Sequence, residues 1–243
     1  MKVIYEPRGK AREYAPLALN LYNGCSHGCS YCYVPKILYK NREQFQQQVK
    51  ARDNILRMLA KDAFEMAKNN DDRTILMSFT SDPYQHLEEN LWITSKAIDI
   101  LMSYNLRFTI LTKGGHRSIP DMQKYRNYAK VSYGVTLHSL DEDTIREYEP
   151  FATSAVERTE ALLTAKELGI KTWVSVEPVI YPDQALDMIR RIHGLVDEFK
   201  VGRWNHDPEA DKIDWVKFRG DVIELLEGFG KDYYIKKDLR NAK

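Results

Sequence analysis

The stretch Cys25-Ser26-His27-Gly28-Cys29-Ser30-Tyr31-Cys32 contains the only three cysteines of this 243-residue chain. Three cysteines cannot form two disulfides, and unpaired thiols without a secretory leader predict a cytoplasmic protein. The spacing Cys-x3-Cys-x2-Cys places all three thiols on one loop, which indicates a metal site. Three thiolates also leave an iron-sulfur cubane one ligand short, so that one iron stays open for chemistry.

A structural zinc ion is the alternative, because three cysteines and one histidine form a known closed zinc site. His27 lies two residues from both Cys25 and Cys29, which is a cramped spacing for joint tetrahedral ligation. The chain also has no second Cys-x2-Cys hairpin. A zinc-stabilised nucleic-acid-binding module without catalysis therefore remains as the second hypothesis.

The composition describes an ordinary folded chain, with 43% hydrophobic and 29% charged residues. No apolar run approaches the roughly 20 residues that span a bilayer, so we expect no membrane partner. The formal net charge of +1 provides no overall attraction to nucleic acid, although it is compatible with a local basic groove. We expect a monomer or a weak dimer.

Apolar, β-rich runs alternate with helical patterns along the chain, which is typical of a parallel sheet with right-handed crossovers. The pattern predicts an α/β fold, a partial (β/α)6 TIM-like barrel of parallel strands in a single domain over residues 1–243. The expected strands are residues 17–21, 74–79, 107–111, 131–137, 171–176 and 196–201, and the expected helices are residues 42–68, 91–104, 120–128, 155–168 and 183–192.

The predicted core covers about residues 15–202. A C-terminal helix around 214–226 and a strand at 233–235, within residues 203–243, are expected to pack over one rim. Ser154 is a candidate N-cap and Gly169 a candidate C-cap for the helix between them. Functional groups should gather at the carboxyl ends of the strands.

The Cys-x3-Cys-x2-Cys spacing, with Tyr31 before the last cysteine, resembles the signature of radical S-adenosylmethionine enzymes. The resemblance implies that Cys25, Cys29 and Cys32 hold a [4Fe-4S] cluster whose fourth iron binds S-adenosylmethionine. It implies cleavage to a 5'-deoxyadenosyl radical that abstracts hydrogen from a substrate. It also implies an external one-electron reductant of the flavodoxin or ferredoxin type, while the cofactors carry the hard chemistry.

Polar segments follow the expected strands in an order that, behind the cysteines, resembles the spore photoproduct lyase-like group, often labelled DNA repair photolyases. The resemblance covers about residues 17–178 and implies that the substrate can be nucleic-acid-like. The segments are Phe79-Thr80-Ser81-Asp82-Pro83-Tyr84-Gln85, Leu111-Thr112-Lys113, Gly134-Val135-Thr136-Leu137-His138-Ser139, Glu149-Pro150-Phe151-Ala152-Thr153-Ser154 and Ser175-Val176-Glu177-Pro178.

The resemblance also assigns cofactor contacts. Ser81 and Asp82 match the segment that meets the amino and carboxylate end of S-adenosylmethionine, and Lys113 matches a cofactor-contacting lysine. Hydroxyls, carboxylates and ammonium groups suit such a ligand. Structural roles stay open, as a capping turn for Ser81 and Asp82 and as a solvated strand end for Lys113. The remaining candidates for cofactor binding are Tyr31, Thr136, Ser139, Arg158 and Glu177, of which Arg158 can instead pair with Glu149 and Glu177 can be structural.

One departure concerns the return of a hydrogen atom to the substrate. The lyase is thought to use a cysteine just before its Thr-Ser-Asp segment, and Phe79 occupies that position here. Tyr33 and Tyr84 are the candidate catalytic donors, with aromatic packing as the alternative reading of both. The segment Arg203-Trp204-Asn205-His206 follows the last expected strand, where an aromatic ring can stack on a base.

Overall fold

An eight-stranded sheet, in the order β1-β2-β5-β6-β7-β8-β9-β10, organises the computed structural model, which describes residues 2–242. β1 pairs antiparallel with β2, and every other neighbouring pair is parallel. The strands are β1 Ile4–Tyr5, β2 Leu17–Leu19, β5 Ile75–Met77, β6 Phe108–Thr112, β7 Val131–Thr136, β8 Lys171–Val179, β9 Glu198–Arg203 and β10 Asp232–Ile235, with a separate pair of β3 Tyr22–Asn23 and β4 Lys50–Ala51.

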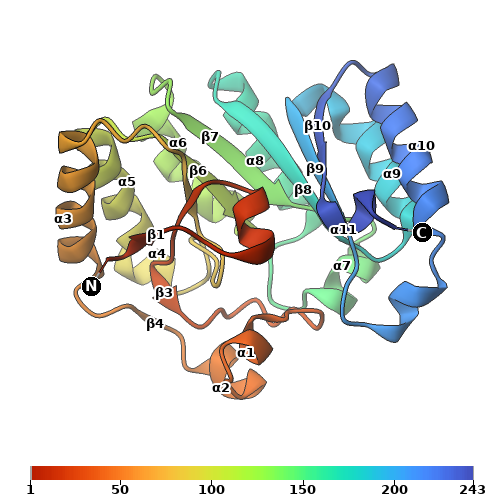
Figure 1. Ribbon diagram of the computed structural model, residues 1–243, viewed down its shortest axis with the longest axis horizontal. Coiled ribbons are helices and arrows are strands. Elements are labelled where there is room, and N and C mark those ends of the chain that lie inside the picture. The colour runs from red at the N-terminus through yellow and green to blue at the C-terminus, as the bar shows by residue number, and fades with distance from the viewer. Residues whose placement is uncertain (1, 243) are drawn as a thin grey trace.

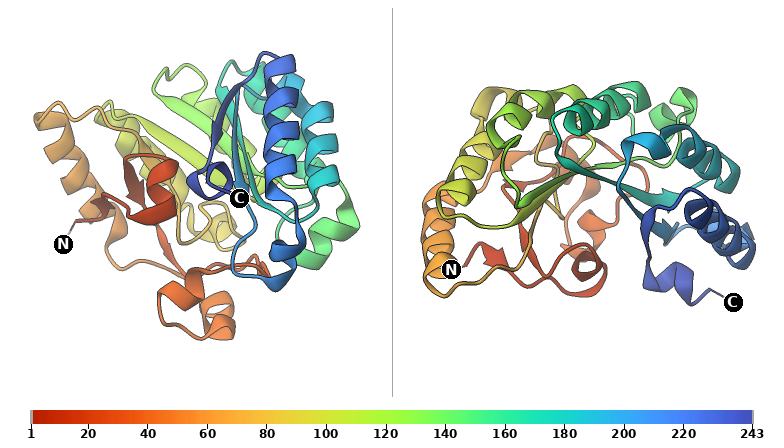
Figure 2. Two further views of the ribbon diagram at one scale, coloured as in Figure 1. Left: turned by 45° about the vertical axis from the view of Figure 1, so that its right-hand side comes forward. Right: turned by 90° about the horizontal axis from the view of Figure 1, so that it is seen from above.

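The larger helices form an arc around the outside of the curved sheet (Figure 2, right). The N-terminal segment lies on the open side of the arc (Figure 2, right), and the short helices α1 and α2 lie below the sheet (Figure 1). The helices are α1 Val34–Ile37, α2 Arg42–Gln47, α3 Ile55–Lys68, α4 Glu88–Leu91, α5 Ile93–Ser103, α6 Ile119–Tyr125, α7 Glu142–Tyr148, α8 Ala155–Glu167, α9 Pro182–Ile192, α10 Trp215–Gly228 and α11 Lys237–Arg240.

The six predicted parallel strands are all present, and the predicted partial barrel is confirmed as an open, mostly parallel sheet. β2 and β5 are buried along their whole length, which explains why they read as continuous apolar runs. The sheet is also wider than predicted. β1 adds an antiparallel edge, and β10, expected to lie over a rim, instead pairs in parallel with β9.

The predicted single helix over residues 42–68 is wrong. The chain forms α2, then the strand β4, then α3, and Asn54 has a left-handed φ of 53° just before α3. The break is stabilised by pairing of β4 with β3 and by the Arg52 amide, which donates to the Leu21 carbonyl. A long-range backbone contact of this kind is invisible to helical periodicity.

Two local devices hold the strand ends in place. The predicted cap is present: Ser154 and Glu157 form a reciprocal capping box at the start of α8. Asn20, at the end of β2, accepts hydrogen bonds from the backbone amides of Phe79 and Thr80. Asn20 therefore holds the segment after β5 against β2. Within residues 2–242, no helix combines the length and the apolar character needed to cross a membrane.

Candidate active site

A pocket opens at the carboxyl ends of the strands, and all three cysteines line it. Its empty volume is about 990 Å³, including the space that is open to solvent. Cys29 is buried, while Cys25 and Cys32 are partly exposed. The loop therefore presents its thiols to one concave space.

Burial raises the pKa of Cys25 and Cys32 and raises that of Cys29 to about 12, so the surroundings disfavour the thiolate form of each cysteine. A bound metal would be needed to hold them as thiolates. Among residues 2–242, no three His, Cys, Asp or Glu side chains converge as ligands of one ion. Cysteine ligands of a cubane bind separate irons at its corners, so they are not expected to converge on one point.

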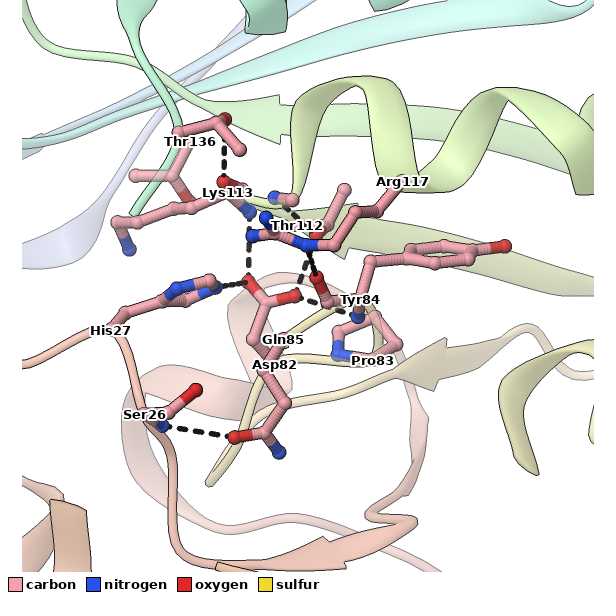
Figure 3. Close-up of polar contacts among 12 residues, drawn as sticks. Ser26, His27, Asp82, Pro83, Tyr84, Gln85, Thr112, Lys113, Arg117 and Thr136 are labelled. Atoms are coloured by element: carbon pink, nitrogen blue, oxygen red, sulfur yellow. Dashed lines mark hydrogen bonds and ion pairs between the residues drawn. The ribbon is translucent and has the colours of Figure 1, made fainter. Parts of the chain in front are cut away.

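The carboxylate of Asp82 ties the cysteine loop to the strand ends (Figure 3). Its Oδ2 lies 3.2 Å from His27 Nε2 and accepts the Lys113 amide at 2.7 Å. Its Oδ1 accepts the Thr112 hydroxyl at 2.6 Å and the Tyr84 amide at 2.8 Å. Burial by itself would raise the pKa of Asp82, but His27 and the hydrogen-bond donors lower it well below the ordinary value. Asp82 is therefore an ionised anchor of the loop.

This placement revises the prediction for the Ser81-Asp82 pair. The Asp82 carboxylate is committed to protein donors rather than free for a ligand. The hydroxyls of Ser78 and Ser81 are buried without a hydrogen-bond partner in the described part of the chain, and both residues line the pocket. Buried hydroxyls normally have a hydrogen-bond partner, so these two are available to a bound ligand. Three thiols and two free hydroxyls around one space fit a metal cluster with a polar ligand.

Further contacts hold the ends of the loop. The Gln85 side chain accepts the Ser26 amide at 2.9 Å, as Figure 3 also shows. Gly28 has a left-handed φ of 69°, and a Cβ there would lie 2.6 Å from the Phe151 ring. The Phe151 amide in turn donates to the His27 carbonyl. A glycine is thus required at the middle of the loop for both conformation and space.

A second buried carboxylate, Glu149, stands behind the loop. Arg158 Nη1 lies 2.5 Å from it, Tyr31 donates its hydroxyl to it, and His138 Nε2 lies 3.6 Å away. Burial opposes ionisation, but Arg158 and Lys113 lower the pKa of Glu149 to about 2. Burial lowers the pKa of His138 to about 4, so its ring is neutral near pH 7.

The structure divides the other predicted site residues into two groups. Lys113 and Thr136 line the pocket with the cysteines. Arg158 does not line it, because its fully buried guanidinium pairs with Glu149 rather than facing the pocket. Tyr84 is buried away from the pocket and donates to Asp121 at 3.1 Å, and the Ser139 hydroxyl accepts a backbone amide near α7.

Glu177 lines the pocket, but its carboxylate also has protein partners. Tyr14 donates to it at 2.9 Å, and the buried ammonium of Lys236 forms an ion pair with it. These partners come from opposite ends of the chain, so no local motif indicated them. The geometry fits the structural reading of Glu177 better than a free ligand contact.

Aromatic and basic side chains line the same pocket as the cysteines. Tyr33 packs between Phe79 and His206, with ring centroids 6.3 and 6.0 Å apart. Arg203 and Trp204 also line the pocket. Sequence reasoning singled out the segment from Arg203 to His206 only because it follows the last predicted strand.

Comparison with known proteins identifies relatives over most of the chain. The model of the Radical SAM superfamily matches residues 19–196. The uncharacterized protein MJ0683 of Methanocaldococcus jannaschii is 28% identical over 173 residues, covering 70% of this chain and 62% of that protein. The uncharacterized protein Rv2578c of Mycobacterium tuberculosis is 25% identical over 168 residues, covering 67% of this chain and 49% of that protein. The matched region therefore spans only part of these relatives.

Solved structures share the fold at low sequence identity. A mutant of spore photoproduct lyase with dinucleoside spore photoproduct superposes with a TM-score of 0.73 at 17% identity, covering 95% of this chain and 78% of the lyase. SuiB of Streptococcus suis bound to S-adenosylmethionine superposes with a TM-score of 0.68 at 12% identity, covering 90% of this chain and 49% of SuiB.

Asp82→Asn should lower the free energy of unfolding by about 3 kcal/mol, because it removes a buried charge that His27 and three donors surround. The reconstituted variant should also retain less iron per chain. Asp99→Asn is the control, since Asp99 forms only an exposed pair with Lys124 at 3.1 Å and should change stability by less than about 0.5 kcal/mol. Equal effects of the two changes in urea unfolding would contradict the anchoring role.

Glu149 should make the free energy of unfolding depend on pH in the acidic range. Its pKa falls from 4.5 to about 2 on folding, so its stabilisation is complete above pH 4.5 and is lost as the pH falls toward 2. Replacing the pair by Glu149→Gln with Arg158→Met should make the unfolding free energy fall less steeply between about pH 4.5 and 3. Exposed Asp143→Asn should leave the slope unchanged, and an unaltered slope in the double variant would refute the assignment.

Proposed function

Because the chain belongs to the radical S-adenosylmethionine superfamily, we propose that Cys25, Cys29 and Cys32 hold its [4Fe-4S] cluster and that the aromatic and basic residues of the same pocket bind a nucleic-acid-like substrate. The protein is a radical S-adenosylmethionine enzyme, and the cluster and S-adenosylmethionine are its cofactors. When bound, they supply a 5'-deoxyadenosyl radical that abstracts hydrogen. The observation that carries the proposal is one pocket lined both by the three thiols and by aromatic and basic side chains.

The cofactor side of the pocket offers groups that suit the charged end of S-adenosylmethionine. The unpartnered hydroxyls of Ser78 and Ser81 can accept from an ammonium group. The Lys113 ammonium lies 3.9 Å from Glu149, is little exposed, and can orient a carboxylate. Thr136 adds a hydroxyl on the same side. The ionised Asp82 holds the cysteine loop in position relative to these groups.

The substrate side suits a ligand with aromatic bases and phosphates. Phe79, Tyr33 and His206 present rings on which a base can stack. The Arg203 guanidinium lies over the Trp215 ring, 5.2 Å from its centroid, and 3.9 Å from the exposed Asp211. Its remaining N–H groups can donate charge-assisted hydrogen bonds to a phosphate. The fold by itself does not choose the substrate, since structures of this fold contain a dinucleoside spore photoproduct or a precursor peptide.

Hydrogen return cannot follow the thiol route implied by the lyase resemblance, because Phe79 stands at that position and the chain has no fourth cysteine. Of the two tyrosine candidates, Tyr33 lines the pocket and Tyr84 does not. Tyr33 is therefore the better candidate donor. The family membership favours a radical enzyme over the alternative, a zinc-stabilised nucleic-acid-binding module without catalysis.

Anaerobic reconstitution should give a brown protein with about four irons per chain, which forms 5'-deoxyadenosine from S-adenosylmethionine and dithionite. Replacing any one of the three cysteines by alanine should abolish both the iron and the product. Ser30→Ala, an exposed change inside the same loop, should retain both. One tightly bound zinc and no iron after this treatment would refute the proposal.

Arg203→Ala should weaken binding of a single-stranded oligodeoxynucleotide by about tenfold, because one charge-assisted phosphate contact is lost. Fluorescence anisotropy of a labelled oligonucleotide measures the change. Arg190→Ala, an exposed substitution on α9, is the matched control and should bind as the unmodified protein does. Identical affinities for the two variants would argue against a nucleic-acid-like substrate in this pocket.

A further inference from the structure

A short exposed stretch lies beside the cysteine loop. It comprises residues 36–44, here called the projecting segment, and every residue in it is exposed. Tyr39 is 98% exposed, and the neighbouring Ile37 and Leu38 are 50% and 41% exposed. The segment includes the end of α1 and the start of α2, and Figure 1 shows these two helices set apart from the sheet and its helices. Three large apolar side chains thus face solvent without packing on the core.

Backbone geometry adds to this observation. Tyr39 has a φ of 52°, in the left-handed region that bulky residues rarely adopt. The conformation points an aromatic ring into solvent, where it gains no packing energy within the chain. Strained, exposed residues of this kind gather at binding sites, where a partner supplies the missing contacts.

The same region is basic, in contrast to the rest of the chain. Residues 34–52 contain five Lys or Arg and a single acidic residue, whereas the whole chain carries a net charge of only +1. The remainder of the chain is therefore net negative. In the described part of the chain, neither Lys36 nor Lys40 forms an ion pair. Their charges are available to an acidic surface.

The projecting segment is joined directly to the cysteines. α1 begins at Val34, two positions after Cys32. The guanidinium of Arg42 donates to the carbonyl of Cys29 at 3.0 Å and to that of Cys32 at 2.7 Å. Cys32 is also partly exposed. A partner seated on this segment would therefore lie next to the loop that is proposed to hold the cluster.

We propose that the projecting segment is the docking site for an acidic electron-carrier protein. The inference rests on the proposed function, in which the cysteines hold a cluster that needs an external electron. One electron leaves the reduced carrier and enters the cluster, and the carrier is oxidised by one electron with no bond made or broken. The exposed side chains of Ile37, Leu38 and Tyr39 supply the apolar centre of the interface and the lysines its charged rim, as in other transient interfaces.

The test uses a variant with Lys36→Glu, Tyr39→Asn and Lys40→Glu, since asparagine tolerates a left-handed φ. The reconstituted protein is titrated with an oxidised, acidic flavodoxin-type protein in a calorimeter. The Kd should rise at least about tenfold, with a smaller difference at high salt. Formation of 5'-deoxyadenosine should slow with the reduced flavodoxin but remain unchanged with dithionite, which needs no docking site.

The matched control is Lys61→Glu, Phe64→Ala and Lys68→Glu on α3, which also reverses two exposed lysines and removes an exposed ring. It should bind flavodoxin as the unmodified protein does. Unchanged flavodoxin affinity in the first variant would overturn the proposal, and loss of oligonucleotide binding instead would assign the segment to nucleic acid. Absence of 5'-deoxyadenosine with dithionite in unmodified protein would refute the proposed function, while the calorimetric result would still decide docking.

Discussion

The buried carboxylate of Asp82 is the contact on which the site depends. Its partners come from three separate segments, namely His27 in the cysteine loop, the turn after β5, and Thr112 and Lys113 at the end of β6. A buried charge is tolerated only when its partners surround it, so the loop and the two strand ends must be in place together. The position of the thiols is thereby coupled to the sheet.

Glu149 is likewise a buried carboxylate that protein partners surround. Arg158 neutralises its charge, and the Tyr31 hydroxyl donates a hydrogen bond to it. Both carboxylates are occupied by partners from the protein itself. The groups left free for a ligand are smaller, the hydroxyls of Ser78 and Ser81. Buried carboxylates thus hold the cysteine loop in place, while the aromatic and basic residues of the pocket carry the proposed specificity.

Much of the fold was predictable because the responsible signals are local. The strands β2 and β5 to β9 are recognisable as apolar runs, and the capping box of Ser154 lies within one helical turn. The failures have long-range causes. The break between α2 and α3 depends on pairing of β4 with β3, and β10 joins the sheet through pairing with β9. Neither partner strand is near in sequence, so periodicity contained no information about them.

The sequence by itself determined the three thiols, their spacing and the lack of a fourth cysteine, because covalent connectivity keeps them on one loop. Only the tertiary structure decided which polar residues after each strand face the pocket. Lys113 and Ser81 do, whereas Tyr84 and Arg158 turn to buried carboxylates. The reason is that a long polar side chain settles where its charge or hydrogen bond is satisfied, and those partners are assembled only by folding.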